Sequence, residues 1–101
     1  MILPSEFAGG TSESPKFPLG RLVATPAALS ALTHDDIMTA ISRHLKGDWG
    51  EVCAEDREEN DRSLREGYRL LSVYRGANGT RFYVITEHDR SVTTVLLPSD
   101  Y

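Results

Sequence analysis

Three runs of β-branched and aromatic residues in the second half of the chain constrain its fold most strongly. They cover residues 68–75, 80–86 and 91–97, and short polar turns separate them. Such residues suit the half-buried surface of a sheet, and turns this short join antiparallel neighbours. In the first turn, Asn78-Gly79 supplies the positive φ angles of a tight hairpin. The sequence therefore predicts a three-stranded antiparallel meander.

The alternation of side chains predicts apolar residues on both faces of this sheet. Leu70 and Tyr74 point to one face of the first strand, whereas Leu71 and Val73 point to the other. A sheet face that carries apolar side chains has to pack against another layer. We expect helices on one face, and either the N-terminal arm or a second protein over part of the other.

The segment before the meander predicts one further strand and a short helix. Residues 17–24 are apolar, and Pro18 restricts such a strand to the edge of a sheet because proline cannot donate to a ladder. Thr25 followed by Pro26 is typical of a helix N-cap and first helical position. We expect a short helix that extends to residue 31.

Two longer helices follow. Thr33 and Asp36 form a variant of the capping box, which predicts a helix over residues 34–46 that stops at Gly47. The very polar stretch 51–66 predicts a third helix that is mostly solvated, held along one edge, or covered by a partner.

The element order is therefore β-α-α-α-β-β-β. This order predicts an α+β domain over residues 17–101, with an antiparallel sheet of three or four strands and helices packed on one face. Residues 1–16 are rich in small polar residues and predict a flexible N-terminal tail.

Charge and composition narrow the classes of function. The 101 residues carry a formal net charge of −4, which disfavours a non-specific binder of nucleic acids or of anionic membranes. No apolar run is long enough to span a bilayer, and no signal peptide is recognisable. Cys53 is the single cysteine, and the three histidines lack zinc-ligand spacing. We expect a cytoplasmic bacterial domain without a metal or cofactor.

Four residues suggest a metal-independent nuclease, such as an RNase toxin. Glu87, His88 and Arg90 in the last hairpin turn, together with His44, provide the base, acid and phosphate clamp of such a site. Neighbours in one turn point in different directions, however, so turn chemistry is the favoured interpretation. For His44, the favoured alternative is a semi-buried histidine whose ring nitrogens bond to the backbone and to the following turn. The sequence favours a protein that is not an enzyme.

Other polar and aromatic residues suggest a binding surface. Asn60 lies on the packing stripe of the third helix, where it either ties the helix to a turn or strand end or shares a cleft with His44 and Trp49. A strip of arginines with a neighbouring tyrosine is the nucleic-acid alternative, which the net charge disfavours. The strip consists of Arg69, Arg75 and Arg81, with Tyr74 or Tyr83 for stacking. The acidic third helix is a possible docking surface for a basic partner.

Several short segments of the chain form a recognisable set. They are 19–26, His44 with 47–50, Asp56 with Asn60, and 84–98. Together they resemble a family of small bacterial proteins of plasmids and other mobile elements, usually labelled only as plasmid-related. The resemblance covers residues 17–101 and implies a genomic context without an activity or catalytic residues. Cys53 departs from it, because a polar helix cap is expected there, which puts the start of the third helix in doubt.

These observations together predict a small non-catalytic accessory or regulatory protein of a mobile element. It would bind a protein partner, possibly interfering with a host nuclease or defence factor, or form a homo-oligomer, with a dimer as the expected form. The binding residues we expect are Trp49, Asn60, Tyr74, Tyr83 and Arg90. The alternatives are the nuclease and a nucleic-acid-binding regulator.

Overall fold

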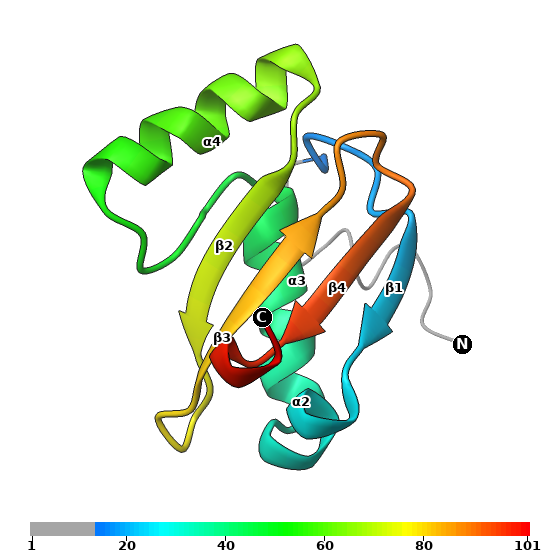
Figure 1. Ribbon diagram of the computed structural model, residues 1–101, viewed down its shortest axis with the longest axis vertical. Coiled ribbons are helices and arrows are strands. Elements are labelled where there is room, and N and C mark those ends of the chain that lie inside the picture. Colours follow the sequence, from blue (N-terminus) through cyan, green and yellow to red (C-terminus); the bar gives the residue numbers. More distant parts are fainter. Residues whose placement is uncertain (1–13) are drawn as a thin grey trace.

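The computed structural model describes residues 14–101, which form an α+β fold with the predicted order of elements. Three helices precede a meander of three strands, and one further strand comes first (Figure 1). The elements are β1 (Arg21–Ala24), α2 (Pro26–Ala31), α3 (His34–Leu45), α4 (Ala54–Glu66), β2 (Leu70–Arg75), β3 (Arg81–Thr86), β4 (Val92–Leu96) and the 3₁₀ turn η1 (Pro98–Asp100).

The four strands form one sheet in the order β1-β4-β3-β2. The meander is antiparallel as predicted, with Leu71 opposite Ile85 in the pair β2–β3. The edge strand β1 pairs in parallel with β4, so the sheet is mixed and the expectation of a purely antiparallel sheet is wrong at this edge. Helices rather than a tight turn follow β1, and a long connection of this kind permits a parallel neighbour.

The capping signals of the first two helices are confirmed. The Thr25 hydroxyl accepts a hydrogen bond from the backbone N–H of Ala28 at 3.1 Å, at the start of α2. Thr33 and Asp36 form the full capping box of α3, each accepting from the backbone N–H of the other at 3.0 Å. The Asp36 carboxylate also accepts from the N–H of Ala77, so the same residue joins α3 to the β2–β3 turn.

The third helix, α4, begins later than the sequence predicts. Cys53 itself is the N-cap of α4, and its Sγ accepts the backbone N–H of Asp56 at 3.4 Å. A thiol is a weak acceptor, but its position satisfies one of the free N–H groups of the first turn. Gly67 ends the helix in the left-handed conformation, with φ of 79°.

Helices cover only one face of the sheet. In Figure 1, α3 passes behind the strands, α4 lies beyond the outer edge of β2, and η1 crosses the near face at the ends of β3 and β4. The main core lies between the covered face and the helices, and a smaller cluster of Phe17, Trp49 and Leu70 lies beside it. The main core consists of Ala28, Leu32, Ile37, Ala40, Ile41, Tyr74, Phe82, Val84 and Val95.

Residues 1–13 of the predicted tail lie outside the described residues. Lys16 donates its backbone N–H to the carbonyl of Leu45 at 2.8 Å, and the Phe17 ring is buried. The described chain therefore begins against the C-terminal end of α3. Within the described residues, no helix is both long and apolar enough to cross a membrane.

Candidate functional site

His44 lies completely buried in the last turn of α3, facing the sheet. Its Nδ1 is 2.6 Å from the hydroxyl oxygen of Ser72 on β2, and its Nε2 is 2.9 Å from that of Thr86 on β3. Both ring nitrogens thus have a partner, and neither is open to a ligand. His44 is therefore bonded within the fold, as the favoured interpretation expects, but it is fully buried and its partners are strand hydroxyls, not the backbone and turn.

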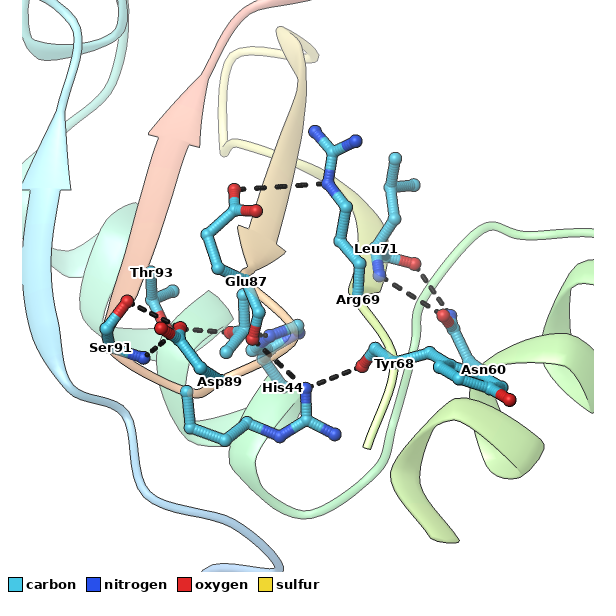
Figure 2. Close-up of polar contacts among 11 residues, drawn as sticks. His44, Asn60, Tyr68, Arg69, Leu71, Glu87, Asp89, Ser91 and Thr93 are labelled. Carbon is cyan, nitrogen blue, oxygen red and sulfur yellow. Dashed lines mark hydrogen bonds and ion pairs between the residues drawn. The ribbon is translucent and has the colours of Figure 1, made fainter. Parts of the chain in front are cut away.

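A chain of hydroxyl groups fixes which nitrogen of His44 carries the proton. Thr93 donates to the carbonyl of Leu19 at 2.7 Å, and a carbonyl can only accept. Thr93 therefore accepts from Thr86 at 2.7 Å, which leaves Thr86 to accept from Nε2–H of His44. The remaining nitrogen, Nδ1, accepts from Ser72. Every proton in this buried chain has one acceptor (Figure 2).

Burial lowers the pKa of His44 to about 3, and the positive charge of Arg90 adds to this effect. The imidazole is therefore neutral near pH 7. Aromatic rings enclose it, since the ring centres of Phe17 and Trp49 lie 5.2 and 5.7 Å from that of His44. A neutral, enclosed imidazole with both nitrogens occupied is not arranged for general acid–base catalysis.

Arg90 fastens the β3–β4 turn to neighbouring backbone. Its guanidinium donates to the carbonyls of Tyr68 at 2.6 Å, Glu87 at 3.1 Å and Ser63 at 3.1 Å. The same group lies 5.6 Å from the centre of the Phe17 ring. This binding of three carbonyls accounts for the arginine without a phosphate ligand.

The other members of the predicted nuclease set are spread over the surface. His88 is exposed at the turn, and Glu87 lies 3.9 Å from Arg69 in an ion pair (Figure 2). His44 is fully buried whereas His88 is exposed, so the two imidazoles do not face one common surface. The structure therefore does not bring the four candidate catalytic residues around one substrate position.

Three of the predicted binding residues are buried and bonded internally. Trp49 donates its indole N–H to Asp61 at 2.9 Å, and the Tyr74 hydroxyl donates to the carbonyl of Asp48 at 2.6 Å. Asn60 uses its amide twice: it donates to the carbonyl of Leu71 at 2.7 Å and accepts from the N–H of that residue at 3.1 Å. Asn60 thus ties α4 to the edge of β2, which is one of the two interpretations of the sequence.

Tyr83 lies on the other face of the sheet, away from α3. Side chains alternate along a strand, so this face also carries Leu71 and Val73 of β2 and Ile85 of β3. The rings of Tyr83 and Tyr101 meet edge to face with their centres 5.8 Å apart. No α-helix lies over this face, which only η1 crosses, so we name it the open face (Figure 1).

A groove crosses the open face along β2. One hollow of about 420 Å³ has Leu71, Val73 and Tyr83 as its floor. A second hollow of about 250 Å³ continues between α4 and β2, and shares Asp56 and Leu71 with the first. The groove residues are Glu51, Val52, Cys53, Asp56, Glu59, Asn60, Ser63, Arg69, Leu71, Val73, Arg81, Tyr83 and Tyr101.

The two walls of the groove carry opposite charges. The α4 wall presents Asp56 and Glu59, and the β3 wall presents Arg81. Arg75 beside the groove is already paired with Glu51 at 2.9 Å. Among the described residues, neither Asp56 nor Arg81 has an ion-pair partner within 4.0 Å. The groove therefore presents one uncompensated charge of each sign.

Sequence reasoning identified Tyr83, Asn60 and the arginine strip, but not the groove as a unit. Some residues of the groove come together only in the folded chain. Asp56 lines it because α4 packs beside β2, and Tyr101 lines it because the C-terminal residues fold back over the sheet. The strand alternation was the available signal, since it puts Arg69, Arg81 and Tyr83 on one face.

No group of histidine, cysteine or acidic residues able to hold a metal ion occurs in the part of the chain that the structure describes. No family model, curated protein or solved structure matches the chain. The groove is therefore interpreted from its own chemistry.

Proposed function

We propose that this chain is a non-catalytic protein-binding module whose docking site is the groove on the open face. The observation that carries the proposal is a groove with an apolar floor, in which Leu71 and Tyr83 are partly exposed and Val73 is buried beneath them. Exposed apolar surface rimmed by charged residues is typical of surfaces that bind another protein.

The distribution of charge supports a protein partner over a nucleic acid. Two of the three arginines in the predicted strip are compensated, Arg75 by Glu51 and Arg69 by Glu87. The opposite wall of the groove is acidic and would repel a phosphate backbone. A protein surface with charges of both signs fits such a groove better.

The condition of the candidate catalytic residues supports a role without catalysis. His44 is neutral and enclosed, and Arg90 is bound to backbone carbonyls. Taken with the resemblance to proteins of mobile elements, the proposal is that of a cytoplasmic accessory or regulatory protein. The partner is either a second copy of this chain or, as this context suggests, a host nuclease or defence factor.

Cys53 allows a direct test, because this single cysteine is exposed and lines the groove. A benzophenone attached to its thiol and irradiated in cells that naturally carry the chain should form covalent adducts with protein. The matched control is the Cys53→Ser/Ser30→Cys variant, which puts the same probe on exposed α2, on the covered side of the sheet. Equal adducts from both positions, or none from Cys53, would contradict the proposal.

A further inference from the structure

We infer that the groove on the open face takes a second copy of this chain, so that the functional unit is a two-fold dimer. The inference rests on the proposed protein-binding function and names the partner. It is carried by the opposite charges of the two groove walls, which fit one another when the groove meets its own copy.

The strand order determines where these charges lie. β2 is the edge strand and forms the floor, so α4 stands on its outer side and β3 on its inner side. Glu59 lines the adjoining hollow together with Arg69 and is paired with Arg62 at 3.6 Å. Asp56 on α4 and Arg81 on β3 line the first hollow from opposite sides of β2. They do not neutralise one another within the chain, since no ion pair joins these walls among the described residues.

A two-fold axis along the groove satisfies both charges at once. Rotation by 180° about such an axis lays the acidic wall of one copy on the basic wall of the other. In a two-fold interface each contact occurs twice, so Asp56 of each copy meets Arg81 of its partner. Complementary potentials of this kind fix the register of an interface and suppress wrong partners.

The apolar part of the open face suits the same arrangement. Tyr101 is 67 % exposed, and it extends the partly exposed floor formed by Tyr83 and Leu71. Placing two such floors together removes aromatic and aliphatic surface from water in both copies. Tyrosine and arginine are the residues that most often provide binding energy at the centre of interfaces.

The edge of β2 is closed to the alternative mode of self-association, in which strands pair across two sheets. Asn60 occupies the N–H and carbonyl of Leu71. The backbone of residues 49–51 occupies those of Val73, since Val73 donates to Trp49 at 3.0 Å and accepts from Glu51 at 2.7 Å. Strand addition needs these groups free. A second copy therefore docks on the face of the sheet and not on this edge.

Charge exchange tests the inference by sedimentation velocity over a concentration series. The native chain should form a dimer. Asp56→Arg and Arg81→Glu should each weaken it roughly tenfold or more, because each substitution creates two like-charge contacts. The double variant Asp56→Arg/Arg81→Glu should recover most of the affinity. An equimolar mixture of the two single variants should form mixed dimers, since that pairing opposes unlike charges.

Two control variants test whether the effect on the dimer is specific to charges in the groove. Glu58→Arg and Arg57→Glu make the same changes of charge at exposed positions of α4 outside the groove lining, and should leave the dimer unchanged. Thermal unfolding of each variant confirms that it is folded. A native chain that stays monomeric at every concentration overturns the inference, as does a dimer in which the double variant is no better than the single ones.

The two proposals fail in different ways. A monomeric chain whose Cys53 probe still reacts with a different protein leaves the protein-binding function in place and removes only the self-association. A dimer that tolerates every groove substitution, together with no adduct at Cys53, removes both.

Discussion

At the scale of single residues, His44 links the protonation of the chain to the stability of its fold. The folded state keeps the imidazole neutral down to a pKa of about 3, whereas an unfolded chain protonates it at the ordinary value of 6.5. Below pH 6.5 the unfolded state binds more protons, so the free energy of unfolding falls with pH until the folded pKa is reached. Stability is therefore complete above pH 6.5 and decreases between pH 6.5 and pH 3.

This linkage gives a measurable slope. We expect the free energy of unfolding to fall by roughly 2 kcal/mol between pH 6.5 and pH 5, the loss of about 1.4 kcal/mol per pH unit for one proton. Urea denaturation at several pH values measures it. His44→Gln should flatten the slope, whereas the exposed His88→Gln should preserve it. The same slope in both variants would show that His44 is not the group that titrates.

Arg90 provides a second prediction at this scale, because its role depends on the shape of the guanidinium. Three carbonyls from two parts of the chain converge on it, and an ammonium cannot offer donors in the same fork. Arg90→Lys should destabilise the fold by about 1–2 kcal/mol, measured by urea denaturation. Arg65→Lys, at an exposed position on α4, is the matched control and should stay within about 0.5 kcal/mol of the native chain. Equal effects would contradict the assigned role.

At the scale of elements, α4 is attached to the sheet through very few groups. Its only buried residues are Asn60 and Ser63, and its other side chains are largely acidic and solvated. The two hydrogen bonds between Asn60 and the backbone of Leu71 therefore help to fix the position of the whole helix. Since this helix is also a wall of the groove, the anchor connects local structure to the proposed binding surface.

Replacing Asn60 should release α4 without unfolding the rest. Asn60→Asp keeps the acceptor for the Leu71 N–H but loses the donor, and it puts a carboxylate against a carbonyl, a change that should cost about 1–3 kcal/mol. Amide hydrogen exchange should quicken in α4 and at Leu71 while β3 and β4 remain protected. Asp61→Asn, which alters only the exposed partner of Trp49, is the control. Uniform loss of protection would mean that α4 is integral to the core.

The elements also show which features a sequence of this kind can predict. Thr33 and Asp36 predict the start of α3 because the capping box is formed by neighbours in the chain. The parallel pairing of β1 is not predictable in that way, since it depends on where the helices carry the chain. The same holds for the groove: alternation places Tyr83 on the open face, but only the fold places α4 beside it. Tyr74 is also an expected binding residue, but its side chain points to the sheet face that the helices cover, so it lies in the core.

At the scale of the whole molecule, the sheet separates the main core, which stabilises the fold, from the groove, which is the proposed binding surface. The main core lies between the sheet and the helices α2 and α3, and the groove residues lie on the opposite side. Val73 and Ile85 of the open face are buried and stabilise the single copy, whereas an exposed side chain on this face, such as Tyr101, contributes little to that stability. In the proposed dimer it contributes to the interface instead.

Tyr101 is the residue at which these two contributions differ most. It is 67 % exposed and touches the fold mainly through the Tyr83 ring and the Arg69 guanidinium, each with its centre 5.8 Å away. Tyr101→Ala should change the free energy of unfolding, measured under monomeric conditions, by less than about 0.5 kcal/mol, as at other exposed sites. The dimer should nevertheless weaken roughly tenfold or more in sedimentation experiments, since truncating a buried tyrosine at an interface commonly costs above 1 kcal/mol. Leu29→Ala removes a side chain of comparable exposure, 60 %, from α2 on the covered side, and should affect neither quantity. If both tyrosine and leucine substitutions leave association unchanged, the open face is not the surface through which copies of this chain meet.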